Sequence, residues 1–223
     1  RLYFRCARCC RASQPSQGLV NIPRLAAPWY LHPAEHPDAW AQLRVGGRLS
    51  FVVVNAANGP GRQPDPYYED ALRRPSLTPL LGYVDVGYGD RSASVVRREA
   101  MAWAQWYGVT ELMLDRVPSQ ARRNSWSLDV IDQLRADGAS KVVANPGTVP
   151  VPELVAHADI TCVVEDSWAV YQRLDLPRWL RNCDPARQWH LVHSCPVRCL
   201  QSVHRLAAAR GAGFVWASRG TVP

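Results

Sequence analysis

Two acidic residues stand where two apolar segments end, and they are the clearest sign of chemistry in this sequence. Asp115 follows the segment Glu111–Leu114, and Glu165 follows the segment Ile160–Val164. Each segment is typical of a buried β-strand, and a carboxylate at such a strand end is costly to desolvate unless it is paired, hydrogen-bonded or wet. Two carboxylates at strand ends of one sheet suit acid–base or nucleophilic chemistry on a polar substrate.

Eight short apolar segments are available to position these acids. They are rich in Val, Leu, Ile and Trp and lack strict alternation, as expected of parallel strands that are covered on both faces. The expected strands are Leu25–Leu31, Leu49–Asn55, Leu80–Val86, Leu112–Val117, Val142–Asn145, Ile160–Glu165, Trp189–His193 and Phe214–Ala217.

The gaps between these segments carry helical patterns, in which apolar residues recur on one side. Pro177 is expected to break one of the helices. The expected helices are Asp38–Leu43, Tyr67–Arg73, Ser92–Tyr107, Ser125–Ala136, Pro150–Ala158, Trp168–Asn182 and Pro196–Arg210.

Eight strand–helix alternations predict a parallel sheet that closes into a single-domain α/β structure, a (β/α)8 TIM-type barrel. An open doubly wound sheet is the alternative. Against it, no G-x-G-x-x-G turn follows the first strand, and the sequence has no Walker-type phosphate loop. The sequence stops at Pro223, shortly after the eighth segment, so we expect the final helix to be missing or very short, as a C-terminal truncation would leave it.

Composition limits the classes of function. The chain has 223 residues, of which 47% are hydrophobic and 20% charged, and this is ordinary for one globular domain. No apolar run approaches the roughly 18 residues of a membrane span. The net charge is +7, but residues 1–24 hold five arginines and no acid. The rest of the chain has no basic stripe interleaved with aromatic residues, so we expect no nucleic-acid partner and no membrane partner.

Residues 1–24 are predicted to form a basic, poorly ordered N-terminal extension before a barrel at residues 25–223. The stretch lacks the uninterrupted apolar core of a signal peptide. Its cysteines would make half a zinc site, but the other half has no supporting histidine pair, so we expect no metal and no cofactor. Cys162 is expected in the core and Cys183 near a helix end. The cysteines of the two halves are Cys6, Cys9 and Cys10, and Cys195 and Cys199.

Polar residues gather at the expected carboxyl ends of the strands, where a barrel builds its active site. One acid at a strand end could simply cap the next helix. The asparagines and Asp85 could only shape turns, and His193 could only be hydrogen-bonded. Several such residues at one end are harder to explain in that way. The candidates are Asn55, Asp85, Asp115, Asn145, Glu165, Asp166 and His193.

Aromatic residues flank these positions. A sugar suits this mixture, because its C–H faces stack on aromatic rings while its hydroxyls bond to carboxylates. The candidate sugar-binding residues are Trp29, Tyr30, Tyr83, Tyr88, Trp168 and Trp216. We expect other tryptophans to pack helices onto the barrel, namely Trp103, Trp106, Trp126, Trp179 and Trp189.

In order along the chain, several segments resemble spherulation-specific family 4, the spherulin 4-like proteins. The specific parts are the glycine-rich turn at 55–61 and the Gly-Tyr-Val turn at 82–84. The matching segments are Pro28-Trp29-Tyr30 with Trp40, Asn55-Ala56-Ala57-Asn58-Gly59-Pro60-Gly61, Gly82-Tyr83-Val84-Asp85 with Tyr88-Gly89 and Arg91, Leu112-Met113-Leu114-Asp115, Asn145-Pro146-Gly147-Thr148, and Ala158-Asp159-Ile160 leading to Glu165.

The resemblance implies a (β/α)8 glycoside hydrolase, similar to glycoside hydrolase family 135 and related to the endo-α-1,4-polygalactosaminidases. It implies cleavage of a polysaccharide such as galactosaminogalactan, a polymer of galactose and N-acetylgalactosamine, outside the cell. We also expect a monomer that needs no cofactor. By similarity Asp115 is the nucleophile and Glu165 the general acid/base.

The chain departs from the family at one position. Members of the family often carry Asp-Glu where this chain has Asp115-Arg116. Arg116 could depress the pKa of Asp115 and repel a deacetylated galactosamine, while Asp166 could partly replace the lost acid. A second hypothesis is therefore a carbohydrate-binding pseudoenzyme. A third is a metal-dependent hydrolase, although His32 and His36 do not form the His-x-His pattern of many such barrels.

Overall fold

The computed structural model describes residues 22–220, which form a closed barrel of eight parallel strands. Each strand pairs with the next along the chain, and β8 pairs with β1 to close the ring. The closure confirms the (β/α)8 fold and excludes the open doubly wound sheet. The strands are β1 (Arg24–Trp29), β2 (Leu49–Val54), β3 (Leu80–Asp85), β4 (Glu111–Asp115), β5 (Lys141–Asn145), β6 (Ile160–Ser167), β7 (Gln188–His193) and β8 (Phe214–Ala217).

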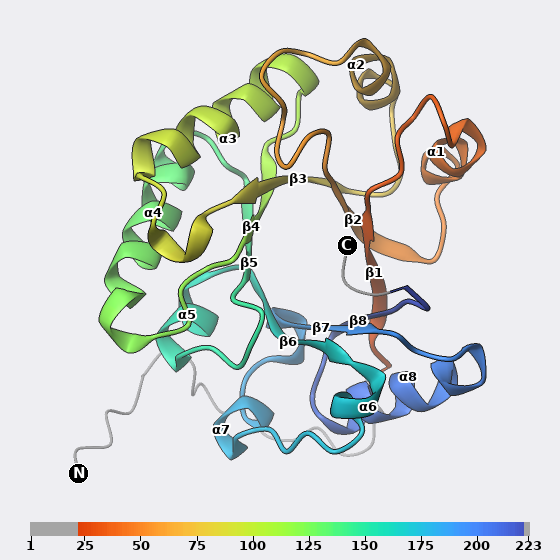
Figure 1. Ribbon diagram of the computed structural model, residues 1–223, viewed down its shortest axis with the longest axis vertical. Coiled ribbons are helices and arrows are strands. Elements are labelled where there is room, and N and C mark those ends of the chain that lie inside the picture. The colour runs from red at the N-terminus through yellow and green to blue at the C-terminus, as the bar shows by residue number, and fades with distance from the viewer. Residues whose placement is uncertain (1–21, 221–223) are drawn as a thin grey trace.

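Helices surround the barrel, as the view along its axis shows (Figure 1). Five of them, α1 to α4 and α8, have 8–15 residues. They are α1 (Pro37–Arg44), α2 (Pro66–Arg73), α3 (Ala93–Tyr107), α4 (Asn124–Ala136), α5 (Pro152–His157), α6 (Trp168–Tyr171), α7 (Arg178–Arg181) and α8 (Leu200–Ala209). Single 3-10 turns lie at Gly87–Gly89, Ala121–Arg123, Pro185–Arg187 and Val197–Cys199.

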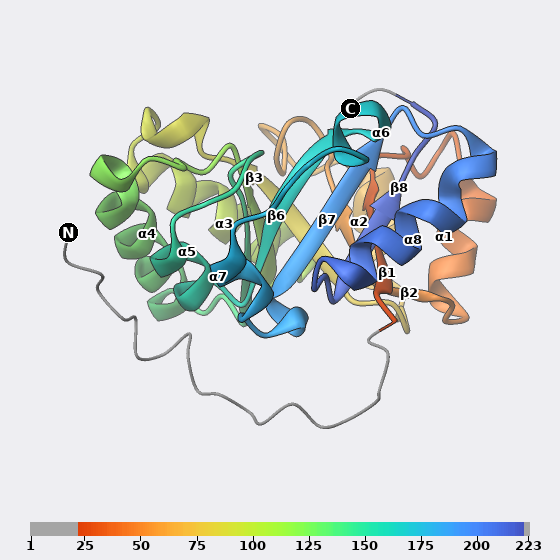
Figure 2. The same cartoon turned by 90° about the horizontal axis from the view of Figure 1, so that it is seen from below.

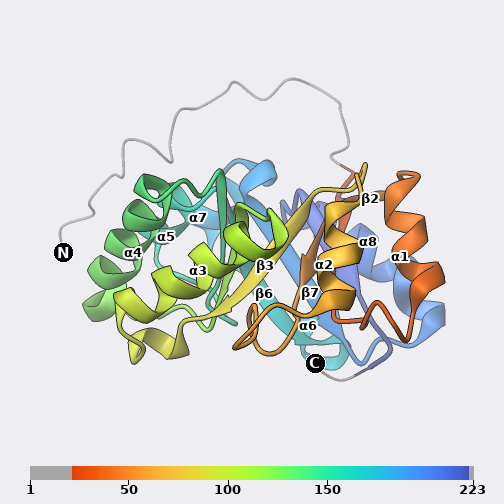
Figure 3. The same ribbon diagram turned by 90° about the horizontal axis from the view of Figure 1, so that it is seen from above.

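The helical segment Trp168–Asn182 is broken, as expected, into α6 and α7. Pro177 lies directly before α7, where its fixed φ suits a helix start but ends any helix that arrives from α6. The two side views place α6 and α7 at opposite ends of the barrel (Figures 2 and 3). The described residues after β8 form no helix.

The apolar core has two layers, one inside the barrel and one between the barrel and the helices. Cys162 lies in the inner layer, as expected. Trp189 does so as well, and the expectation that it packs a helix onto the barrel was wrong. The ring of Trp189 packs edge-on against Phe51, with the ring centroids 5.2 Å apart. Residue 189 is at one of the alternate positions of β7 whose side chains point into the barrel. Trp103 and Trp126 pack in the outer layer, as expected.

Gly82 and Trp103 fix the position of β3. A Cβ at residue 82 would lie 2.6 Å from the buried ring of Trp103, so only glycine allows α3 to pack so closely on this strand. The indole nitrogen of Trp103 also donates a hydrogen bond of 2.8 Å to the carbonyl oxygen of Tyr83. The helix therefore holds the strand that carries Tyr83 and Asp85.

The N-terminal residues 1–21, with Cys6, Cys9 and Cys10, lie outside the described residues. Arg24, which we assigned to the extension, is the first residue of β1. Cys195 is buried and Cys199 partly buried, and both are free thiols. Within residues 22–220, no group of three or more His, Cys, Asp and Glu residues is arranged to hold a metal ion. No helix in this range is long and apolar enough to cross a membrane.

Candidate active site

A cavity of about 390 Å³ opens at the carboxyl ends of the strands. It brings together side chains from β3, β4 and β6 with residues of the loops that follow β2, β3, β4 and β5. Six of its eight lining residues are candidates from the sequence. The lining residues are Asn58, Tyr83, Asp85, Tyr88, Asp115, Arg116, Gly147 and Glu165.

Three polar residues lie side by side at one level of the sheet. Asp85 on β3 is in register with Asp115 on β4, and Asp115 is in register with Asn145 on β5. Parallel strands in register present their side chains to the same face. The row therefore aims all three side chains into the mouth of the barrel.

Glu165 reaches the cavity because β6 contains a bulge. The register between β6 and β7 shifts between Cys162 and Val164, so that Val163 and Val164 both pack in the outer layer. Glu165 is then opposite Leu191, which lies in the inner layer. Strict alternation from Cys162 would have pointed Glu165 outward.

Asn145 links the two candidate catalytic acids. Its side-chain nitrogen donates to Asp115 Oδ1 at 2.9 Å and to Glu165 Oε2 at 2.6 Å. Its side-chain oxygen accepts from the backbone N–H of Gly147 at 2.9 Å, which fixes the orientation of the amide. The buried amide thus holds the two carboxylates at a set separation.

Asp115 has a second donor, the hydroxyl of Tyr83, at 2.7 Å from Oδ2. Burial raises the pKa of Asp115, while the bonds from Tyr83 and Asn145 act against this rise. Burial also raises the pKa of Glu165, and the nearby charge of Asp115 adds to the effect. Both carboxyls therefore hold a proton more readily than free ones.

Asp85 and Arg116 form an ion pair on the wall of the cavity. Arg116 Nε donates to Asp85 Oδ1 at 2.7 Å, and Arg116 Nη2 bonds to Oδ2. Asn58 and the backbone N–H of Gly87 also donate to the same carboxylate, at 3.5 and 2.8 Å. Burial opposes ionisation of Asp85, but the bonds from Arg116 and Gly87 outweigh it and lower the pKa.

Backbone strain is concentrated around this cavity. Non-glycine residues rarely adopt the left-handed conformation, yet Asn58, Tyr88 and Arg116 have φ values of 53°, 54° and 55°. All three line the cavity. The backbone N–H of Tyr88 donates to the carbonyl oxygen of Arg116 at 2.6 Å, which locks two of these loops together. Strain of this kind is typical of sites where position matters more than stability.

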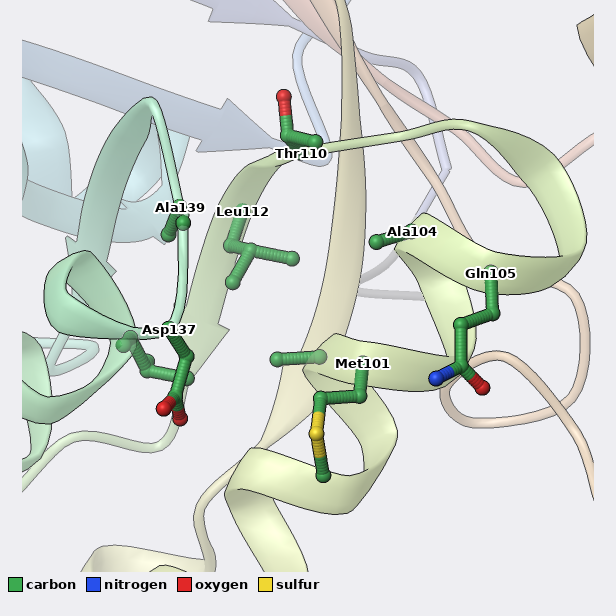
Figure 4. A pocket seen from close by; sticks show the side chains of 10 residues that line it. Met101, Ala104, Gln105, Thr110, Leu112, Asp137 and Ala139 are labelled. Carbon is green, nitrogen blue, oxygen red and sulfur yellow. The ribbon is translucent and has the colours of Figure 1, made fainter.

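A second hollow lies outside the barrel, between α3 and α4 (Figure 4). It measures about 270 Å³ and is lined mainly by small and apolar side chains, with Met101 and Gln105 on α3 and Asp137 after α4. Asp137 is paired with Arg97 through two hydrogen bonds of 2.5 and 2.7 Å. Asp137 is the only acid among the residues that line this hollow, so the cavity at the strand ends is the better candidate for chemistry.

A family model decides the identity of the chain. The model of spherulation-specific family 4 matches residues 24–222. The chain belongs to this family.

Solved structures agree on the barrel of this family 4 chain. The crystal structure of Aspergillus clavatus Sph3 in complex with GalNAc matches with a TM-score of 0.72 and 22% sequence identity, over 89% of this chain and 90% of that chain. QR15, an aldolase, matches with a TM-score of 0.51 and 15% identity, over 90% of both chains. At these identities the likeness shows the fold. No curated protein matches the chain significantly.

Three further candidates do not line the cavity. The ring of Tyr30 meets Tyr83 edge-on, with the centroids 5.9 Å apart, and burial followed by the charges of Asp115 and Glu165 raises the pKa of Tyr30. Trp216 packs against the inner layer of the barrel. Asn55 shapes the turn after β2, because its side-chain oxygen accepts from the N–H of Gly59 at 2.9 Å.

Other candidates have contacts away from the cavity. Asp166 accepts from the N–H of Ser167 at 2.7 Å and is opposite Val192, which faces the outer layer. Trp29 packs in the outer layer, and Trp168 packs against Tyr171 with the centroids 6.4 Å apart. His193 bonds to Ser194 at 3.1 Å. His32, considered as a metal ligand, instead meets Asp65 at 3.5 Å.

Asn58 and Gly147 line the cavity but were not among the candidates from the sequence. Both belong to the turns that carry the family resemblance, so the motifs themselves were the signal. Asn58 is in the glycine-rich turn and donates to Asp85, and Gly147 orients Asn145 through its backbone.

Proposed function

We propose that this chain is a glycoside hydrolase in which Asp115 is the nucleophile and Glu165 the general acid/base. The observation that carries the proposal is the bond of one amide, Asn145, to both carboxylates, at 2.9 and 2.6 Å. The bonded oxygens can be no farther apart than the sum of these lengths, which is less than the roughly 6.5 Å at which the spacing of inverting enzymes begins. This spacing supports a retaining reaction.

In the first step, Asp115 attacks the anomeric carbon and the bond from that carbon to the leaving oxygen breaks. Glu165 gives its proton to the leaving oxygen. In the second step, Glu165 takes a proton from water while the water oxygen attacks the anomeric carbon and releases Asp115 as a carboxylate. The raised pKa of Glu165 suits the acid role, and the donors on Asp115 favour its ionised form.

The proposed substrate is a polysaccharide that contains amino sugars, such as galactosaminogalactan. Membership of the family and the GalNAc bound to the similar structure of Sph3 support this choice. The half-exposed ring of Tyr88 on the cavity wall offers a stacking surface for a sugar ring. We also propose that the chain acts outside the cell as a monomer and needs no cofactor.

The test is release of reducing ends from partially deacetylated galactosaminogalactan by the parent chain, Asp115→Asn and Glu165→Gln. We expect release by the parent and loss in both variants by about a thousandfold or more, as is usual when a nucleophile or its acid partner is removed. A matched control is Glu153→Gln, an exposed acid on α5. Undiminished release by either active-site variant would refute its assigned role.

A carbohydrate-binding protein without catalysis is the second candidate. The observation that favours it is the ion pair of Arg116 with Asp85, which places a guanidinium on the cavity wall at a sequence position where the family often has an acid. Tight binding of the polysaccharide by a folded parent that releases no reducing ends would support this alternative.

A further inference from the structure

Arg116 is the only arginine that lines the cavity among the described residues. Its left-handed backbone turns the side chain across to β3, where it holds both oxygens of Asp85. The side chain of Asp85 is 7% exposed, whereas that of Arg116 is 46% exposed. The pair therefore presents its cationic member to the cavity and keeps its anionic member behind.

The guanidinium has donors to spare. An arginine side chain carries five N–H groups. Two of them bond to Asp85, and no contact within residues 22–220 uses the other three. The ring of Tyr88 lies 5.5 Å from the guanidinium carbon and helps to hold the group in place. The free donors can therefore meet an oxygen acceptor on a bound sugar.

The charge around the cavity also matters. Arg116 offsets the charge of Asp85, one of the three carboxylates that line the cavity. An ammonium group on a sugar beside Arg116 would face a like charge.

Building on the proposed function, we propose that Arg116 is a specificity-determining residue that selects N-acetylated over free-amine sugar rings. The carbonyl oxygen of an acetamido group accepts from the free guanidinium N–H groups. A protonated amine offers only donors to the same groups, so it is both unpaired and repelled.

The test is calorimetric binding of fully N-acetylated and fully deacetylated α-1,4-linked galactosamine tetrasaccharides at about pH 6. The full chain carries Glu165→Gln in every sample, so that a bound oligosaccharide is not cut. We expect binding of the acetylated form at least tenfold tighter, and a reversed preference in Arg116→Glu. Arg116→Gln keeps donors without charge, so it should weaken the exclusion of the amine and keep acetylated binding within a few fold.

Arg122→Glu is the matched control, because this substitution makes the same change of charge. Arg122 lies exposed on the same loop and does not line the cavity. It should leave the preference unchanged. Two results would overturn the role of Arg116 alone. One is equal binding of both tetrasaccharides by the chain that carries only Glu165→Gln, and the other is an unchanged preference in both Arg116 variants. Binding of neither tetrasaccharide would instead count against the proposed substrate, and the inference would fall with it. If Arg116→Glu does not fold, Arg116→Gln carries the test.

Discussion

The hydroxyl of Tyr83 donates a hydrogen bond of 2.7 Å to the carboxylate of Asp115. Burial, together with this bond, raises the pKa of Tyr83, so the tyrosine keeps its proton and stays a donor. Its backbone is held by Trp103, and its ring is supported by Tyr30. Tyr83, the hydrogen-bond donor to the proposed nucleophile, is thus held at both its backbone and its ring.

Replacement of Tyr83 by phenylalanine should raise the pKa of Asp115, because a bond that favours the carboxylate is removed. We expect the acidic limb of the kcat/KM profile to move to higher pH and the rate to fall by about 10- to 100-fold, the scale of one hydrogen bond to a charged group. Tyr67→Phe, an exposed tyrosine on α2, is the control. An acidic limb that does not move would contradict this role.

Asn145→Ala should reduce kcat more than it changes KM. The substitution removes the one group that holds Asp115 and Glu165 at a set distance, and it leaves two buried carboxylates short of a donor. We expect kcat to fall about 100-fold, and the comparison is Asn182→Ala, an exposed asparagine after α7. A variant that lost only substrate affinity would show that Asn145 binds sugar and does not position the acids.

The unfolding free energy should depend on pH in opposite directions for the contribution of Asp115 and Glu165 and for that of Asp85. Glu165 and Asp115 have raised pKa values in the folded chain, so folding takes up protons and their contribution is lost as pH rises above the ordinary values of 4.5 and 3.8. Asp85 has a lowered pKa, so its contribution is lost as pH falls below 3.8.

Glu165→Gln should therefore raise the unfolding free energy at neutral pH by about 0.5–2 kcal/mol, the usual scale when an active-site strain is relieved. It should also flatten the fall in Tm as pH rises above 4.5, the ordinary pKa of a glutamate. Thermal unfolding over a pH series checks this, with Glu153→Gln beside it. A variant less stable than the parent at pH 7 would refute the prediction.

Gly82→Ala should destabilise the barrel by about 1–3 kcal/mol, because the added methyl group meets the buried ring of Trp103 at 2.6 Å. Denaturant unfolding measures the change. Gly47→Ala is the comparison, since a Cβ at that position has no neighbour within 4 Å. Equal stability of the two variants would mean that α3 can move away from β3.

The sequence was sufficient for the barrel, because each strand is a short, mainly apolar segment and the five from β3 to β7 end in a polar residue. The bounds of β8 are those expected, and those of the other strands differ by at most two residues. The bulge in β6 could not be foreseen, since periodicity cannot show an extra residue between Cys162 and Val164. Strict alternation from Cys162 would turn Asp166 inward and Glu165 outward. The pattern alone therefore could not identify Glu165 as the inward acid.

The inward or outward direction of Trp189 was missed for a similar reason. A buried strand covered on both faces has no polar side to set its phase, so the tryptophan could belong to either layer. The left-handed residues Asn58, Tyr88 and Arg116 were also hidden, because neither side chain nor spacing indicates a positive φ. The role of Asn145 between two acids depends on register across three strands, which only the fold supplies.

The bulge in β6 has a consequence for how relatives of this chain are compared. Because of the bulge, the number of residues in the strand decides which acid points inward. The mere presence of acids in the strand does not. A relative with one residue fewer between the positions of Cys162 and Glu165 would still present its glutamate to the substrate, although its sequence would look one position out of step. The inward-facing acids of such relatives are therefore better matched by counting back from the turn into α6 than by aligning the strand from its start.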